Sequence, residues 1–245
     1  MAGPRHYGRW VLGAMVVLPA LVLALGLATP LPELAPWRSG PPPGWWAAAN
    51  RQLEVWQASG VKQKLRFTYV PLDQVSDHLL LAVLVGEDIN FFDHSGVDVR
   101  AWSEALQQWM EGGRLRGAST LTQQLAKNLF LSRERTLRRK LKELCVAWQL
   151  ERQLGKRRIL ELYVNVTEFG PGLFGVQAAA EAYFHCTAED LNPDQAAALA
   201  ATIPSPSRDN PKTNTARFRA RKRIIAQRAS QATWLVPLLR QVKGQ

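Results

Sequence analysis

Two glutamates lie in dense polar blocks of this 245-residue chain, and their surroundings suggest acid/base chemistry. Glu87 lies in the block 86–96, and Glu143 ends the block 139–143, which also carries an arginine and two lysines. Between them, the block 117–128 is rich in amides and hydroxyls and contains one lysine. Carboxylates exchange protons in catalysis, and cations beside one of them favour an anionic substrate. The sequence therefore indicates a site that moves a proton next to a bound anion.

Glu87 follows an apolar run, 79–84, that has helical spacing, and it precedes two phenylalanines. A carboxylate against an apolar wall loses hydration, which raises its pKa toward that of a useful proton acceptor. The alternative is that Glu87 and Asp88 only cap a loop at a helix end. His94 could orient a carboxylate or satisfy the loop. We expect no metal site, because the four histidines form no His-x-x-x-His pair.

Gln124 and Lys127 lie three residues apart, so they share one face of the helix expected there. An amide and an ammonium on one face suit a phosphate or sugar oxygen. Arg135, eight residues after Lys127, could bring a guanidinium to the same anion. The alternative for this block is an ordinary polar helix face with a solvated run of charges.

Glu143 follows Arg139 by four residues and Lys140 by three, so all three side chains lie on one side of a helix. Taken alone, this spacing favours intrahelical salt bridges, each worth only about 0.2–0.5 kcal/mol. A catalytic part for Glu143 needs further support.

The elements that position these side chains are expected to be mainly α. Helical spacing recurs from Asp77 onward, and almost no alternating strand pattern occurs. Ser119 is the expected N-cap of a helix over 120–131, and Pro193 is an expected first-turn residue. Segment 64–70 could be extended, and 165–175, with three glycines and a proline, is expected to be a loop. Further helices are expected around 137–148, 176–184, 194–202 and 216–229.

Composition limits the class of protein and its partners. The chain is 47% hydrophobic and long enough for one sizeable core. Its net charge of +11 attracts phosphate-bearing partners, with nucleic acid the first candidate on charge alone. A membrane-length apolar segment near the N-terminus reverses that ranking. Cys145 and Cys186 lack metal-site spacing and are expected to be two buried thiols, with a single disulfide as the alternative.

Residues 10–28 carry no charge and match the ~20 residues that cross a bilayer. We expect a transmembrane helix there, with 1–9 in the cytoplasm because the flanking cations precede it. A cleaved signal peptide is the alternative. Prolines make 29–43 a stiff connector. The catalytic domain is expected over 44–235, with a C-terminal tail over 236–245.

Five polar motifs follow one another in a fixed order, over about 75–228. They read Glu-Asp-x-x-Phe-x-x-His-x-Gly, Gly-x-Ser-Thr-x-Thr-Gln-Gln-x-x-Lys-Asn, Arg-Lys-x-x-Glu, Ile-Leu-Glu-x-Tyr-x-Asn and Gly-x-x-x-Ala-Ala-x-x-Tyr-Phe. In this the chain resembles the peptidoglycan glycosyltransferase family (family 51). With no transpeptidase region after residue 245, it is similar to the monofunctional members of that family. The sequence departs from the family at His185-Cys186, where Gly-Lys is common.

The resemblance implies a mainly α, lysozyme-like fold in which a larger head faces a smaller, membrane-dipping jaw. It implies that the enzyme polymerises lipid II into glycan strands, with inversion at the anomeric carbon and release of undecaprenyl pyrophosphate. No cofactor is required by the sequence, although a divalent cation (Mg or Mn) could assist at the pyrophosphate.

Carried over by motif, Glu87 is implied to be the general base that deprotonates the acceptor 4-hydroxyl. Lys127 and Arg135 are implied to neutralise the departing pyrophosphate, because charge develops on its oxygens. Glu143 is implied to assist at the donor site, directly or through a divalent ion. The remaining implied substrate-binding residues are Ser119, Gln124 and Asp88.

Other functions remain open at the level of sequence. A membrane-bound lytic transglycosylase or muramidase would cleave finished glycan, and an inactive scaffold would only recruit cell-wall enzymes. The partners implied by the resemblance are lipid II, the growing glycan-lipid, the membrane and a transpeptidase, with no nucleic acid. The implied location is the bacterial inner membrane, with the catalytic domain on its periplasmic side.

Overall fold

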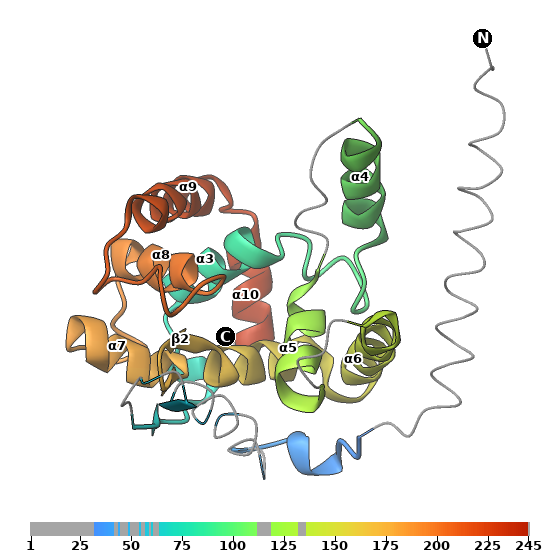
Figure 1. The fold of residues 1–245 in the computed structure, drawn as a ribbon, viewed down its shortest axis with the longest axis horizontal. Helices are drawn as coiled ribbons and strands as arrows, with labels where there is room; N and C mark the ends of the chain where they lie inside the picture. Colours follow the sequence, from blue (N-terminus) through green and yellow to red (C-terminus); the bar gives the residue numbers. More distant parts are fainter. Residues whose placement is uncertain are drawn as a thin grey trace, which may run out of the picture.

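The computed structural model describes residues 32–41, 64–111, 119–131 and 136–244, together with residues 44, 49, 54, 57, 58 and 60; the side chains of Leu106, Trp109 and Met110 lie outside this description. The described part is mainly helical, as predicted (Figure 1). Its elements are η1 (Ala35–Trp37), β1 (Arg66–Phe67), η2 (Leu72–Gln74), α3 (Asp77–Glu87), α4 (Val99–Met110), α5 (Leu121–Phe130), α6 (Leu137–Val166), β2 (Glu168–Gly170), β3 (Leu173–Phe174), α7 (Val176–Phe184), α8 (Pro193–Thr202), α9 (Ala216–Gln231) and α10 (Leu235–Lys243).

Helix α3 is the centre of the core and ends at Glu87. Its sequence, DHLLLAVLVGE, is apolar on every side, and a helix of that kind must be buried all round. Helices α8, α9 and α10 pack against it. The alanine-rich α8 allows a close approach, and it begins at the predicted first-turn Pro193 behind an Asn192 cap. This packing fixes the end of α3, and therefore the backbone of Glu87.

Helix α6 is a 30-residue element that bends at Gly155, where φ is +71°. A positive φ suits glycine because it has no Cβ. The stretch before the bend carries Glu143, and α6 packs extensively on α5. The stretch after the bend is buried almost completely. Figure 1 shows α5 and the first stretch of α6 on one side of the molecule, α8 and α9 on the other, and α4 standing apart, while the rest of α6 runs across the base.

The predicted loop 165–175 contains two short strands. In the described chain, β1 pairs in parallel with β3, and β2 pairs antiparallel with β3, in the order β1-β3-β2. Gly175 joins the sheet to α7 with a φ of +78°, and a Cβ there would lie 2.8 Å from the Asn165 carbonyl oxygen. The expectation of a loop was therefore wrong in part, because strands of two and three residues are too short to show an alternating pattern.

Part of the predicted connector packs onto the domain. Leu34 and Trp37 are buried, and the Trp37 ring meets Phe130 of α5 edge-on with centroids 4.9 Å apart. The Arg158 guanidinium donates to the carbonyl oxygens of Trp37 and Gly40 and forms an ion pair with Glu161. Residues 34–40 are therefore a docked segment, while the proposed domain limits at 29–43 and 44–235 stay predictions.

The segment expected as a C-terminal tail, 236–245, is mostly helix, and the domain limit at 235 stays a prediction. Helix α10 buries Leu235 and Leu239, and Lys243 Nζ donates to the Val75 carbonyl oxygen (2.9 Å) and Asp77 Oδ1 (2.7 Å). Pro237 reads as a helix breaker in the sequence, but it falls in the first turn of α10, where proline is tolerated.

The predicted membrane span, 10–28, lies outside the described residues. Within the part of the chain that the structure describes, no helix is both long and apolar enough to cross a bilayer. Trp102 and Trp109 both fall on α4, but Trp109 belongs to the side chains that are not described.

Candidate active site

Glu87 lies at the last residue of α3, where two donors from distant parts of the chain hold its carboxylate. Gln124 Nε2 on α5 donates to Oε2 (2.9 Å), and Arg221 on α9 donates to Oε1 (2.7 Å). The Glu87 side chain is 10% exposed. The site is thus built where α3, α5 and α9 meet, and one carboxylate keeps a narrow opening to solvent.

Burial raises the pKa of Glu87 above 4.5, the ordinary value for glutamate. The hydrogen bond from Gln124 and the charges of Arg221 and Lys127 act in the opposite direction and lower this pKa in part. Because desolvation is the largest cause, Glu87 is a stronger proton acceptor than a hydrated carboxylate. It has the property that the sequence indicated.

Gln124 is itself fixed by a buried tyrosine on α6. The Tyr163 hydroxyl donates to Gln124 Oε1 (3.0 Å), so the amide must present its Nε2 to Glu87. Burial, with the nearby charge of Glu87, holds the pKa of Tyr163 well above 10, so the hydroxyl stays a donor. Tyr163 is therefore a positioning residue that the sequence analysis did not single out.

Lys127 is one turn along α5 from Gln124 and belongs to the same site. Burial lowers the pKa of Lys127. The charges of Arg139 and Lys140 also lower this pKa, whereas those of Glu143 and Glu87 raise it. Lys127 forms no ion pair with any described residue, so its ammonium is open to an external anion.

Glu143 is buried on α6 and holds two cations. Arg139 Nη1 donates to Oε2 (3.0 Å), and Lys140 forms a short ion pair with Oε1. Lys140 also donates to Gln123 Oε1 (3.1 Å) and to Ser119 Oγ (3.3 Å). The intrahelical salt bridges predicted from the spacing are confirmed. The Glu143 carboxylate therefore holds Arg139 and Lys140 in place and does not face solvent.

Asp88 lies beside Glu87 but turns inward. Its carboxylate accepts from the backbone N–H of Leu121 (2.8 Å), and His94 Nε2 lies 3.0 and 3.1 Å from its two oxygens. Thr120, not Ser119, is the N-cap of α5, so the expected cap was wrong by one residue. Ser119 is exposed at the start of the block. Asp88 thus ties α3 to α5, and its contact with substrate stays a prediction.

The structure brings together Glu87, Gln124, Lys127 and Glu143, from three helices, as the motif order implied. Arg135 lies outside the described residues. Arg221 was missed by sequence reasoning, because 216–229 was interpreted only as a basic helix.

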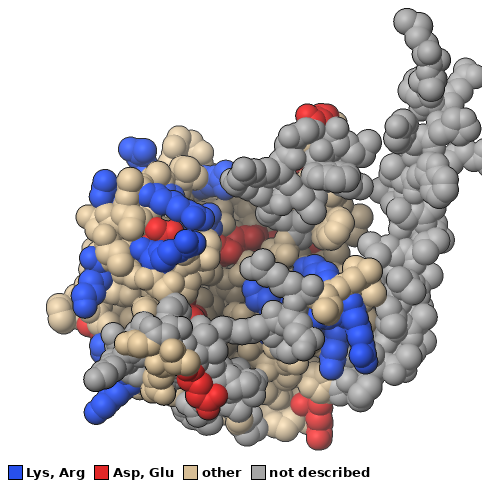
Figure 2. Space-filling view, in the orientation of Figure 1, with Lys and Arg blue, Asp and Glu red and all other residues tan. Residues whose placement is uncertain are grey.

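Figure 2 shows carboxylates in a hollow between the two sides of the molecule, with lysines and arginines beside it. Buried Nε atoms of Arg139 and Arg221 have no hydrogen-bond partner among the described residues, which leaves donor capacity for a ligand.

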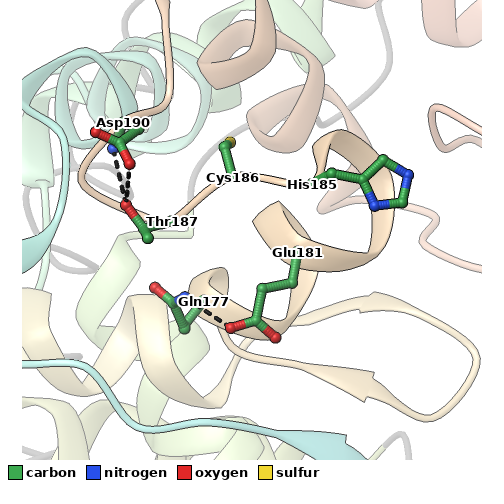
Figure 3. A pocket seen from close by; sticks show the side chains of 6 residues that line it. All are labelled: Gln177, Glu181, His185, Cys186, Thr187 and Asp190. Carbon is green, nitrogen blue, oxygen red and sulfur yellow. Dashed lines mark hydrogen bonds between the residues drawn. The ribbon is translucent and has the colours of Figure 1, made fainter.

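Two further hollows lie away from Glu87. One, of about 560 Å³, contains His185 and Cys186, the pair that departs from the family pattern, and Figure 3 shows their side chains pointing apart. The other, of about 530 Å³, is lined by Lys64, Arg66 and Lys212 among others.

Within the described ranges, no group of three or more histidine, cysteine, aspartate or glutamate side chains could hold a metal ion. Cys145 and Cys186 form no disulfide in the described part of the chain, and only Cys145 is buried.

The arrangement defines a class of protein: a helical domain with a desolvated carboxylate suited to accept a proton and nearby cations suited to hold an anion. Comparison with known proteins gives the family. The family model for transglycosylases matches residues 54–230, and the chain belongs to that family.

Similar proteins include three named biosynthetic peptidoglycan transglycosylase. The one from Bordetella avium is 37% identical over 91% of this chain and 95% of its own length. The one from Nitrosospira multiformis is 40% identical over 76% of this chain and 82% of its own. The one from Cupriavidus metallidurans is 45% identical over 67% of this chain and 73% of its own.

Proposed function

We propose that this protein is a peptidoglycan glycosyltransferase that polymerises lipid II into glycan strands for the cell wall. The observation that carries the proposal is the Glu87 carboxylate, desolvated and held by Gln124 and Arg221, near Lys127, which forms no ion pair with a described residue. The names of the similar proteins support the same activity.

In the proposed reaction, Glu87 accepts the proton of the acceptor 4-hydroxyl as that oxygen attacks the anomeric carbon of the growing chain. A new C–O bond forms with inversion, and the bond to the pyrophosphate oxygen breaks. The electron pair leaves on undecaprenyl pyrophosphate, where Lys127 and Arg135 neutralise the charge. A pyrophosphate of this kind needs cations and no general acid, so one base is sufficient.

Glu143 then acts through the cations that it holds. Its two oxygens are occupied by Arg139 and Lys140, and the Arg139 Nε is left unpartnered in the described part of the chain. A divalent cation on Glu143 would have to displace one of those cations, so the described residues do not fit a protein-held Mg or Mn.

The proposed location is the outer face of the bacterial inner membrane, with 10–28 as the anchor and a transpeptidase as a partner. The uncharged run after the N-terminal cations supports this orientation. A substrate with a polyprenyl tail lies in the bilayer, so an anchored domain meets it there. In the proposed lysozyme-like arrangement, α3, α8 and α9 belong to the head and α4 belongs to the jaw.

The test is polymerisation of lipid II by the purified full-length protein, followed on gels that separate glycan strands. Glu87→Gln removes the base and should lower the rate by about a hundredfold or more. Glu181→Gln changes an exposed glutamate of α7 and should polymerise normally. An additional sample with a chelator shows whether a divalent cation contributes.

Near-normal polymerisation by a folded Glu87→Gln protein would remove Glu87 from the role of base. Release of fragments from finished sacculi, with lipid II left unused, would instead identify a lytic enzyme.

A further inference from the structure

Helix α9 carries more positive charge than its surroundings neutralise. It contains five arginines, one lysine and no acidic residue. Arg221 meets Glu87, Lys222 meets Asp194 (2.6 Å) and Arg217 lies 3.6 Å from Asp209. Half of the cations therefore have no carboxylate among the described residues, and these are Arg219, Arg223 and Arg228.

Large apolar side chains are exposed beside these cations. Phe218 and Ile225 point into the core, but Ile224 is 49% exposed, and Trp234, three residues after α9 ends, is 51% exposed. Cations attract anionic headgroups, and indole rings favour the headgroup level of a bilayer. This combination is that of a surface which binds at a membrane interface.

The position of α9 in the molecule agrees with such a contact. Figure 1 shows α9 and α4 toward the same end of the molecule, on either side of the C-terminal end of α3. Figure 2 shows lysines and arginines gathered over the α9 side of that end. On α4, Val99 is 62% exposed. A flat surface laid against this end would reach both helices.

We propose that the outer face of α9, with Ile224 and Trp234, binds anionic phospholipid headgroups, so that the side of the site opposite α4 also rests on the membrane. This inference rests on the proposed membrane location. It adds a contact that the anchor at 10–28 does not provide, because a single span leaves a domain free to tilt. With α9 bound, the opening beside Glu87 faces the leaflet that holds the substrate.

A nucleic acid or an acidic polymer would also be attracted by the arginines. The exposed Ile224 disfavours both, because an aliphatic side chain gains free energy by entering an acyl layer and gains little from a hydrated polymer. The experiment therefore includes such a polymer as a competitor.

The experiment places the photo-crosslinker benzoylphenylalanine at Ile224 in the full-length protein, reconstituted in nanodiscs with or without phosphatidylglycerol. The matched control position is Trp148 on α6, which is 42% exposed and also lies against an arginine, Arg152. We expect lipid adducts at 224 and few at 148, with fewer at 224 in discs of phosphatidylcholine alone. Arg223→Glu with Arg228→Glu should lower the yield at 224 by roughly tenfold or more.

Equal lipid labelling at 224 and 148, or a yield at 224 that ignores both lipid charge and the two substitutions, would overturn the proposal. Labelling of added polyglutamate or DNA at 224, in place of lipid, would overturn it in favour of an acidic polymer. Polymerisation of lipid II is measured on the same discs, so failure of the α9 contact is distinguishable from failure of the proposed function. A protein that does not enter the discs would refute the anchor instead.

Discussion

At the scale of single residues, the two glutamates share a site but differ in their surroundings. Glu87 is held by one neutral amide and one arginine and keeps an opening to solvent. Glu143 is closed off by two cations on its own helix. The first is suited to receive a proton and the second to fix positive charge in place. Two residues of the same type thus divide the chemistry through their neighbours.

The Glu87 site allows a prediction about pH. Burial raises the pKa of Glu87, whereas Arg221 lowers it, and a base must be ionised to act. The rate should therefore fall as pH decreases through this raised pKa. Arg221→Ala removes the opposing charge, so the midpoint of that acidic fall should move up by roughly one pH unit. Arg221→Lys keeps the charge and should move it less.

The measurement is the initial rate of lipid II polymerisation against pH, with Arg240→Ala, an exposed arginine of α10, as the control. A midpoint that stays in place or moves to lower pH in Arg221→Ala would show that Arg221 does not act on the base.

Spacing along the chain could predict some of these residues and not others. Gln124 and Lys127 lie three residues apart within one motif, and this spacing alone places them on the same face of a helix. Arg221 reaches Glu87 from 134 residues away, and its helix has five other cations with no feature that separates them. Tyr163 is buried in the core, and its hydroxyl orients Gln124. Contacts between distant elements depend on packing, which periodicity does not reveal.

At the scale of elements, the N-terminus of α5 forms a joint with the end of α3 and the loop that follows it. Asp88 accepts the Leu121 N–H there and contacts His94, while Thr120 caps the helix and donates to the Gly96 carbonyl oxygen (2.7 Å). Polar groups buried in such a joint must stay paired. The adjacent Glu87 and Asp88 therefore combine one chemical group with one structural group.

This joint predicts a loss of stability in Asp88→Ala. The substitution leaves a buried backbone N–H and a histidine without their acceptor, which should lower the free energy of unfolding by about 1–3 kcal/mol. Thermal unfolding of the full-length protein in detergent measures the change. Asp73→Ala is the control, because the Asp73 side chain is 54% exposed and makes only a 3.6 Å ion pair. An unchanged melting temperature in Asp88→Ala would contradict the structural part given to this residue.

Helix type and extent followed well from the sequence where apolar spacing was long. The limits of α3, α8 and α9 agree closely with the expectations, since each begins or ends at a capping or turn residue. The short strands and the bend at Gly155 could not be predicted. Both depend on the surroundings: β3 needs partners on either side, and nothing in the local sequence separates a bent helix from two helices.

At the scale of the whole molecule, the last helix holds the first core helix. Lys243 donates to Val75 and Asp77 at the start of α3, while Arg157 donates to the carbonyl oxygens of Val242 and Lys243. The C-terminal segment thus closes the core around the helix that carries Glu87.

Leu239→Ala tests this closure. A buried leucine replaced by alanine should cost about 2–5 kcal/mol of unfolding free energy, because it loses burial and leaves a cavity. Arg240→Ala, the exposed neighbour, should unfold like the parent protein. If residues 236–245 were an independent tail, the two variants would have the same stability in a thermal or urea melt.

The docked segment 34–40 has a consequence for how the enzyme finds its substrate. Only five residues, 29–33, lie between Ala28, the end of the proposed anchor, and the buried Leu34, and the six Cα–Cα steps between them span at most about 20 Å. With 10–28 in the bilayer, a short tether keeps the domain at the membrane surface. Its search for substrate is then confined to two dimensions. The effective concentration of a lipid-linked substrate depends on the leaflet area that the tether lets the domain reach.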